Sequence, residues 1–393
     1  MVSREAPERA WLVAVESEDS NIWQAQSSID ELARLAESAG AEVVGRLTQR
    51  LKSPHKTHYL GKGKIEELAS LKSSQNFQVA IFDDELTPLQ QLNLEKVLRV
   101  KVIDRAALIL DIFAKRAKTR EGQLQVELAQ LQYILPRLAG QWSHLERLGA
   151  GIGTKGPGES QMETDRRLIR HRIQILKKRI EEIRRHRELY RSRRHRSGLP
   201  IVSLVGYTNA GKSALFNTIT RADVLTRDKL FSTLDPTTRR MRLDGGGMAL
   251  LTDTVGFIQK LPPTIVTAFR ATLEELSEAS LLIHVVDLTS PNAAEQCQTV
   301  EGILRELEVS EKPRLTALNK IDLLPDKKSH WDETRVMDYL ASHIEPGDDD
   351  TIFISAVKGW GLGKLRERIT TILKARDVAI PAPAGQDFSL PIS

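Results

Sequence analysis

Two glycines separated by four residues, followed by a lysine and a serine, carry the clearest chemical signal in this sequence. The apolar stretch IVSLV leads into GYTNAGKS, and an amphipathic stretch follows. Strand, glycine loop and helix in that order allow backbone amides and a helix N-terminus to bind phosphate. The lysine of such a loop reaches the β and γ phosphates, and the serine hydroxyl ligates Mg²⁺. We therefore predict a Mg²⁺-dependent nucleotide site, with Lys212 catalytic and Ser213 a metal ligand. Its phosphate loop comprises Gly206, Tyr207, Thr208, Asn209, Ala210, Gly211, Lys212 and Ser213.

A second motif, DTVG, follows the apolar stretch from Met248 to Leu251. An aspartate at a strand end would lie beside the metal, and the glycine amide would lie near the γ phosphate. We predict that Gly256 is catalytic and that the motif contacts nucleotide through Asp253, Thr254, Val255 and Gly256. The next residue is Phe257, where many GTPases carry a glutamine that orients the attacking water. Hydrolysis by the chain alone should therefore be slow.

A third motif, NKID, indicates which base is bound. It follows the predicted strand Arg314 to Leu318. The Asp322 carboxylate can accept hydrogen bonds from guanine N1 and the exocyclic amine, which adenine does not present in that arrangement. An acceptor left unpaired by the wrong base discriminates strongly, so GTP is preferred over ATP. Backbone amides after a further strand would contact the guanine oxygen. The predicted base site comprises Asn319, Lys320, Ile321, Asp322, Ser355, Ala356 and Val357.

The segment FSTLDPTTRR lies between the first two motifs and is rich in threonine. It is either a polar hairpin loop or a switch loop that completes the coordination of Mg²⁺. As a switch loop it would add Phe231, Ser232, Thr233, Leu234 and Asp235 to the nucleotide site.

Two ways of raising the slow rate of hydrolysis stay open. A binding partner could order the switch loops, or K⁺ could bind beside the phosphates. Asn209 stands where potassium-activated GTPases carry a cation-binding asparagine. The alternative is that Asn209 only shapes the loop.

Apolar periodicity predicts an α/β protein in several parts. We expect a small N-terminal α/β domain at 1–112, a basic helical hairpin at 113–197, a GTPase domain at 198–376 and a flexible tail at 377–393. Both α/β parts should contain mostly parallel sheets, because strands and helices alternate. In the first domain we predict strands at 11–15, 42–44, 79–83 and 100–104, and helices at 29–39, 65–71 and 89–98.

Leucine and isoleucine recur at three- and four-residue steps on both sides of a glycine-rich stretch at 149–160. Two such seams predict helices packed as an antiparallel hairpin. We expect Pro136 to kink the first helix, the glycines to form a mobile tip, and Thr164 to cap the second helix. The seams are Leu124, Leu128, Leu131, Leu135, Leu138, Trp142 and Leu145, and then Ile169, Ile173, Leu176, Ile180, Ile183 and Tyr190.

The second helix carries an unusual excess of positive charge. Between Asp165 and Arg196 there are fourteen lysines or arginines and four acidic residues, whereas the whole chain has a net charge of +5. A solvated helix usually mixes both signs, so this density favours binding to RNA phosphates. We select Arg166, Arg170 and Arg172 as RNA-binding candidates.

The composition excludes two classes of protein. The single cysteine cannot form an internal disulfide, and no apolar run is long enough to cross a membrane. We therefore expect a cytoplasmic protein that is not inserted in a membrane. We also expect it to be a monomer.

Together these motifs resemble the HflX family of ribosome-associated GTPases. The resemblance extends from about residue 10 to about residue 375 and includes GYTNAGKS, FSTLDPTTR, DTVGFIQKLP, NKID, YLGKGKIEEL, LQVELAQL and GPGESQMETDRR. It implies GTP hydrolysis stimulated by the ribosome, binding to the large (50S-type) ribosomal subunit and its rRNA, and splitting of stalled or idle ribosomes. It also favours Thr233 as the second Mg²⁺ ligand and as catalytic. The glycine-rich tip would add Lys155, Gly156, Pro157 and Gly158 to the RNA contacts.

Two other functions stay open. The chain could be an RNA-binding regulator in which nucleotide state only switches affinity. It could instead be an RNA-remodelling NTPase that uses ATP through the N-terminal domain, although GKGK at 61–64 is too short to support a second nucleotide site.

Overall fold

The computed structural model describes residues 6–17, 22–138, 157–196, 198–221, 230–231, 234–260, 262, 265, 274–324, 331–343 and 350–375. The chain forms two compact units. Unit 1 comprises residues 1–183 and 259–269, and unit 2 comprises residues 184–258 and 270–393. The short segment at 259–269 therefore belongs to unit 1, although the sequence on either side of it belongs to unit 2.

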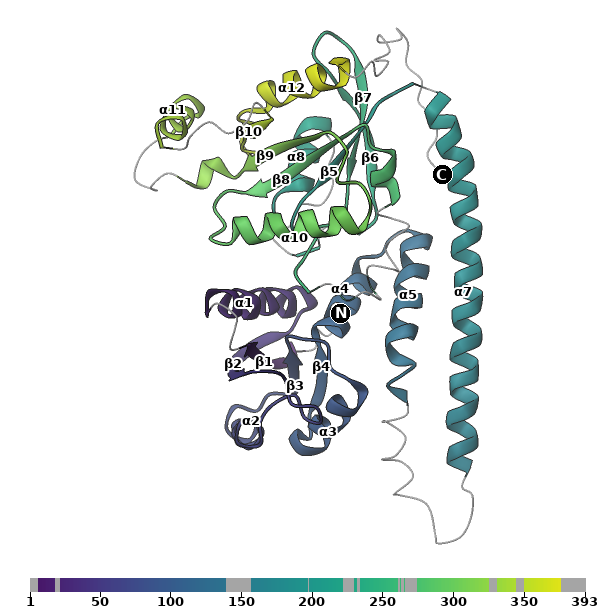
Figure 1. Cartoon of the computed structure of the whole chain (residues 1–393). Helices are drawn as coiled ribbons and strands as arrows, with labels where there is room; N and C mark the ends of the chain where they lie inside the picture. Colours follow the sequence, from purple (N-terminus) through teal and green to yellow (C-terminus); the bar gives the residue numbers. More distant parts are fainter. Residues whose placement is uncertain are drawn as a thin grey trace. The chain divides into compact units, whose positions relative to one another are not determined.

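Unit 1 contains a four-stranded parallel sheet in the order β2-β1-β3-β4, as the alternation of strands and helices predicts (Figure 1). Its core combines Trp11, Val13, Phe82 and Val102 of the strands with Leu68 and Leu94 of the helices. The strands are β1 (Arg9–Ser17), β2 (Glu42–Leu51), β3 (Val79–Phe82) and β4 (Lys101–Asp104), and the helices are α1 (Ile22–Ala39), α2 (Lys62–Gln75), α3 (Pro88–Leu98), α4 (Arg105–Arg116) and α5 (Arg120–Ile134).

A cluster of charged groups is buried in unit 1. Arg105 is 1% exposed and contacts Glu31 at 3.0 Å and Asp83 at 2.5 Å. The Lys260 ammonium contacts Asp83 and Asp84, each at 2.5 Å. Burial tends to raise the pKa of Asp83, but the charges of Arg105 and Lys260 outweigh it and hold the pKa below the ordinary value. Lys260 thus ties the described start of the segment 259–269 to unit 1.

Helix α5 packs along the long helix α7 (Pro157–Arg196) as the two apolar seams predict (Figure 1). Leu124 and Leu128 of α5 are buried against Ile173 and Leu176 of α7. Helix α5 ends at Ile134, but Leu135 keeps helical backbone angles (φ −50°, ψ −47°) and its N–H donates to the carbonyl oxygen of Leu131 at 3.0 Å. Pro136 has no N–H to continue this ladder, so the regular helix stops there. The residues beyond 138, on the far side of the predicted kink, lie outside the described residues.

The predicted start of the second helix is wrong. Helix α7 begins at Pro157, and Thr164 lies inside it rather than at its N-cap. Proline suits the first turn of a helix because its missing N–H has no intrahelical partner there. The glycine-rich tip at 149–156, together with Trp142 and Leu145, lies outside the described residues.

Unit 2 contains a six-stranded sheet in the order β10-β9-β8-β5-β7-β6, in which only β6 runs antiparallel to its neighbour. Helices α8 and α12 cover one face of the sheet and α10 covers the other (Figure 1). The elements are β5 (Ile201–Val205), α8 (Lys212–Thr220), β6 (Thr237–Arg242), β7 (Met248–Asp253), β8 (Leu281–Asp287), α10 (Ala293–Glu306), β9 (Arg314–Asn319), α11 (Glu333–His343), β10 (Thr351–Phe353) and α12 (Leu362–Ala375), with single 3₁₀ turns η3 (Glu274–Glu278) and η4 (Ile321–Leu323).

Candidate nucleotide-binding site

All four nucleotide motifs lie at the carboxyl ends of parallel strands in unit 2. The phosphate loop follows β5, DTVG follows β7, NKID follows β9, and the Ser355 loop follows β10. Ligands of open α/β sheets bind in the crevice outside these strand ends. The topology therefore gathers motifs that are far apart in the sequence at one edge of one sheet.

Gly206 begins the phosphate loop in a conformation that other residues rarely adopt. Its φ is +148°, and a Cβ atom there would lie 2.3 Å from the carbonyl oxygen of Val285 on the neighbouring strand β8. No L side chain fits at this separation. Glycine thus lets the loop turn close to β8 before α8 begins at Lys212.

The Lys212 ammonium is held under the loop. It donates to the carbonyl oxygens of Gly206, at 3.0 Å, and Tyr207, at 2.8 Å, and the residue is 6% exposed. Burial lowers the pKa of Lys212 to about 8, although the nearby Asp253 carboxylate acts in the opposite direction. An ammonium fixed at this depth is suited to bind phosphate oxygens.

The first residue of β7's DTVG motif meets the first turn of α8. The Ser213 hydroxyl donates to Oδ2 of Asp253 at 2.7 Å, and both residues are buried. Hydroxyl and carboxylate oxygens are the ligands that Mg²⁺ prefers, and Mg²⁺ usually takes its remaining ligands from phosphate and water. The donor set therefore fits Mg²⁺, held by Ser213 with Asp253 beside it. Mg²⁺ would neutralise the charge that develops on the phosphates.

Asn319 connects the base motifs to the phosphate loop. Its Nδ2 donates to the carbonyl oxygen of Ala210 at 2.8 Å, and its Oδ1 accepts the N–H of Ala356 at 2.9 Å. Nearby, the Ser355 hydroxyl donates to the Asp322 carboxylate at 2.6 Å. These bonds fix the orientation of the carboxylate that is predicted to recognise guanine.

Lys320 has an ion-pair partner, Asp287, that the sequence analysis did not predict. Its ammonium contacts Asp287 at 2.7 Å, and Asp287 ends strand β8 at the same edge of the sheet. Thr218 of α8 was missed too, and its hydroxyl donates to the carbonyl oxygen of Ala356 at 2.7 Å. An aspartate at the end of the largely apolar strand β8, whose other polar residue is His284, was a usable signal for Asp287, whereas Thr218 carried none.

Several predicted nucleotide contacts have side chains turned toward the protein. The Thr254 hydroxyl donates to the carbonyl oxygen of Leu204 at 2.5 Å, and Ile321 is fully buried in the small core beneath α11. Val255 is also buried, whereas Val357 is 78% exposed. If these residues contact nucleotide, they must do so through backbone groups.

The loop between the first two motifs is only partly described. Phe231 and Leu234 are buried, and Asp235 follows them. Ser232 and Thr233 lie outside the described residues. The role predicted for Thr233 in Mg²⁺ binding and catalysis therefore stays a prediction.

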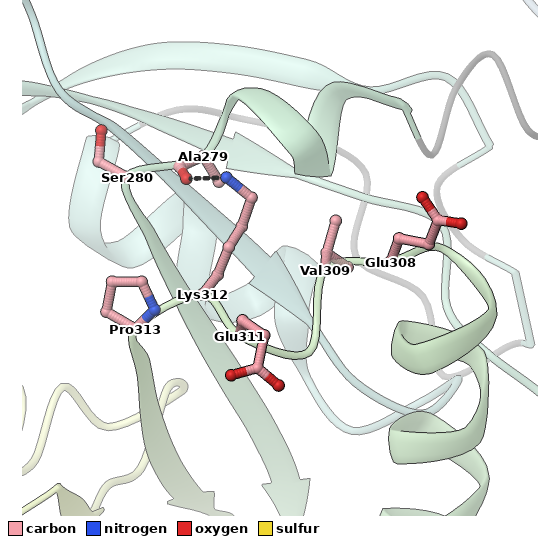
Figure 2. Close-up of a pocket in the computed structure, with 7 residues that line it drawn as sticks. All are labelled: Ala279, Ser280, Glu308, Val309, Glu311, Lys312 and Pro313. Carbon is pink, nitrogen blue, oxygen red and sulfur yellow. Dashed lines mark hydrogen bonds between the residues drawn. The ribbon is translucent and has the colours of Figure 1, made fainter.

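A pocket of about 630 Å³ lies at the opposite edge of the same sheet (Figure 2). Ser280 and Pro313 of its lining directly precede β8 and β9. The Lys312 ammonium beside them donates to the carbonyl oxygen of Ala279 at 2.8 Å. This pocket is separate from the nucleotide motifs, which lie at the carboxyl ends of these strands.

The RNA-binding candidates differ in their surroundings. Arg172 contacts Glu127 of α5 at 2.7 Å, which neutralises part of its charge. Arg170 is exposed, and Arg166 is half-buried. Pro157 and Gly158 form the first turn of α7, whereas Lys155 and Gly156 lie outside the described residues.

A phosphate loop, a serine–aspartate pair that fits Mg²⁺ and an NKID motif lie at one edge of a mostly parallel sheet. Together they define a P-loop GTPase. Family models agree with this class along most of the chain. A model described as GTP-binding GTPase N-terminal matches residues 26–114, one described as GTP-binding GTPase Middle Region matches 116–194, and one described as 50S ribosome-binding GTPase matches 201–320.

Curated relatives identify the particular family. GTPase HflX of Caldanaerobacter subterraneus is 49% identical over 92% of this chain and 80% of its own length. GTPase HflX of Lacrimispora saccharolytica is 46% identical over 95% of this chain and 85% of its own length. GTPase HflX of Escherichia coli is 44% identical over 87% and 78%. This chain belongs to the HflX family of GTPases, and it binds and hydrolyses GTP.

Within the part of the chain that the structure describes, no helix is long and apolar enough to cross a membrane. The same residues contain no group of three or more His, Cys, Asp or Glu side chains that could hold a metal ion. A Mg²⁺ site built on Ser213 needs no such group, because phosphate and water supply the other ligands.

Proposed function

We propose that this chain docks on the large ribosomal subunit and its rRNA and uses GTP to split or recycle stalled or idle ribosomes. The observation that carries the proposal is the assembled GTP site in a domain matched by the 50S ribosome-binding GTPase model. The basic helix α7 supports it, because its excess positive charge suits rRNA phosphates. Such a factor would act as a monomer in the cytoplasm.

In this proposal, Lys212 and the Gly256 amide hold the γ phosphate while Ser213 and Thr233 ligate Mg²⁺. The other predicted contacts of the phosphate loop, DTVG, NKID and Ser355–Val357 position the nucleotide. Phe257 replaces the glutamine found in many GTPases and is only 2% exposed, so its side chain cannot orient water. Hydrolysis is therefore slow until the ribosome orders the site.

Sedimentation of ribosomes tests the proposal. Intact ribosomes are mixed with the chain and GTP, GDP or a non-hydrolysable GTP analogue, and both co-migration and subunit separation are measured. The proposal expects separation with GTP or its analogue and stimulated GTP hydrolysis on large subunits. Nucleotide-dependent binding without separation or stimulation would instead support an RNA-binding regulator. ATP hydrolysis that survives Lys212→Ala would support an ATP-dependent remodelling enzyme.

The basic helix requires a separate test. We expect ribosome affinity to fall steeply with salt and to weaken on charge reversal of Arg166, Arg170 or Arg172. Arg170→Glu is the cleanest variant, because charge reversal of Arg172 would also place two carboxylates side by side at Glu127. Glu66→Lys on α2 is a control that changes charge in the opposite direction elsewhere. Affinity that is insensitive to salt and to Arg170→Glu would exclude RNA binding by α7.

We also propose that K⁺ stimulates hydrolysis through Asn209. This residue has a φ of +63° and is half-buried at the predicted cation position of the phosphate loop. Turnover should be higher in KCl than in NaCl of equal ionic strength, and Asn209→Ala should remove the difference. Equal turnover of the wild-type chain in the two salts would exclude K⁺ as a cofactor.

A further inference from the structure

Thr208 of the phosphate loop contacts two loops that come from different parts of the sequence. Its backbone N–H donates to the carbonyl oxygen of Phe257, directly after DTVG, at 2.7 Å. Its Oγ1 accepts the N–H of Phe231, at the start of FSTLD, at 3.1 Å. Thr208 is 6% exposed, so both hydrogen bonds are shielded from water. One residue therefore holds one end of each loop.

Phe231 has an unusual backbone conformation at this contact. Its φ is +56°, and the residue is only 2% exposed. Residues with a Cβ atom occupy the left-handed region only where surrounding contacts enforce it, and such residues cluster at switch regions. Here the contacts are the Thr208 hydroxyl and the buried side chains of Phe231, Leu230 and Leu234. Losing one contact should therefore change the backbone of this loop.

The DTVG loop also lies in close contact with the phosphate loop. The Phe257 N–H donates to the carbonyl oxygen of Gly206 at 3.1 Å, which completes a short parallel bridge with Tyr207. A Cβ atom on Gly256 would lie 2.8 Å from Cα of Thr208 and 3.0 Å from Nζ of Lys212. A γ phosphate held by the Gly256 amide and Lys212 would enter at this contact. Any resulting shift of the loop would act directly on the backbone of Thr208.

We propose that Thr208 is a positioning residue that couples the Phe231 loop to the DTVG loop during GTP binding and hydrolysis. A shift of the DTVG loop would move the Thr208 backbone through the N–H bond to Phe257. The Thr208 hydroxyl would then move the Phe231 N–H, which donates to it. The inference rests on the proposed contacts of both loops with the γ phosphate and Mg²⁺. It adds the physical link between them, which neither motif contains by itself.

Hydrogen exchange of the full chain tests the first half of this coupling. Thr208→Val keeps the shape of the side chain but removes the acceptor, and Thr208→Ser keeps the hydroxyl. We expect the Phe231 amide to exchange about 3- to 10-fold faster in Thr208→Val, as the net strength of one hydrogen bond implies. Thr208→Ser should restore the wild-type rate. Thr299→Val is the matched control, because its hydroxyl donates to the carbonyl oxygen of Glu295 within α10.

Comparison of nucleotide states tests the second half. In the wild-type chain, a non-hydrolysable GTP analogue and GDP should give different exchange rates in both the Phe231 and Phe257 peptides. In Thr208→Val the Phe257 peptide should still respond, while the response of the Phe231 peptide should shrink at least about threefold. The kcat for GTP should fall about 3- to 10-fold in Thr208→Val and return to the wild-type value in Thr208→Ser.

Unchanged exchange at Phe231 in Thr208→Val would overturn the inference. So would failure of Thr208→Ser to restore exchange and kcat, because the methyl group rather than the hydroxyl would then matter. None of these measurements requires ribosomes. A chain that hydrolyses GTP but does not split ribosomes would therefore contradict the proposed function. The exchange and kcat measurements would still decide whether Thr208 couples the two loops.

Discussion

At the scale of single residues, the site depends on side chains that hold loops as much as on those that meet nucleotide. Asn319 shows this most clearly, because its amide joins the phosphate loop to the Ser355 loop with two hydrogen bonds. It is 2% exposed, so removal of the amide would leave buried partners unsatisfied. An unsatisfied buried group costs about 1–3 kcal/mol.

Asn319→Ala should therefore weaken GDP binding by about 10- to 100-fold, as the loss of these two bonds implies. Titration with a fluorescent guanine nucleotide would measure it. Asn292→Ala, at the start of α10, is a control outside the site. Binding within about threefold of the wild-type value would show that the two loops hold their positions without this amide.

His284 should make the free energy of unfolding of unit 2 depend on pH. It is 4% exposed on strand β8. Burial is the main cause that lowers its pKa to about 4, and Arg314 and Lys212 lower it further against the opposing effect of Glu301. Below about pH 6.5 the unfolded histidine takes up a proton that the folded one does not. The free energy of unfolding should therefore fall as the pH decreases from about 6.5 to about 4.

The expected loss over this range is about 3 kcal/mol, and His284→Gln should remove most of it. Urea denaturation of both proteins at pH 7, 5.5 and 4.5 would test this. The comparison cancels the contribution of the other histidines. Stability curves that stay parallel across this range would mean that His284 is not kept neutral by folding.

At the scale of elements, the α5–α7 hairpin is held by its apolar seam. Leu176 is fully buried between the helices, whereas Leu168, two turns earlier on α7, is 58% exposed. Only the first of these side chains is shielded from water by α5. Ion pairing between Arg172 and Glu127 adds little, because both side chains are about 40% exposed.

Leu176→Ala should reduce the free energy of unfolding of unit 1 by about 2–5 kcal/mol, the usual range for a buried leucine. Leu168→Ala on the same helix should change it by less than about 0.5 kcal/mol. Urea denaturation followed by circular dichroism would measure both. Equal effects of the two substitutions would argue against the packing seen here.

At the scale of the whole molecule, the chain passes from unit 2 to unit 1 after Ile258 and returns at Arg270. Lys260 secures the intervening segment, because its ammonium meets the 2% exposed Asp83 carboxylate. The buried carboxylates of Glu31 and Asp83 are balanced by Arg105 and Lys260, and Lys260 also meets the partly exposed Asp84. Loss of Lys260 would leave one buried negative charge uncompensated, which is costly.

Lys260→Gln should therefore loosen this segment and increase hydrogen exchange of the peptide that contains residues 258–262 by at least about tenfold. Asp84→Asn should have a smaller effect, because Asp84 is 32% exposed and water screens its charge. Lys64→Gln, which breaks an exposed pair with Glu67, is the matched control. An unaffected segment in Lys260→Gln would mean that apolar contacts such as those of Ile265 hold it.

The sequence by itself determined the nucleotide, the alternation of strands and helices apart from the unpredicted α4, and the apolar seam of the hairpin. These follow from local spacing, since GYTNAGKS, NKID and heptad steps each lie within one element and its loop. Tertiary structure decided which groups meet across the sheet, such as Asn319 with Ala210 and Lys320 with Asp287. It also decided that Thr208 joins two loops and that Lys260 belongs to unit 1. Such contacts depend on strand order and on backbone direction at loop ends, and neither leaves a periodic signal in the sequence.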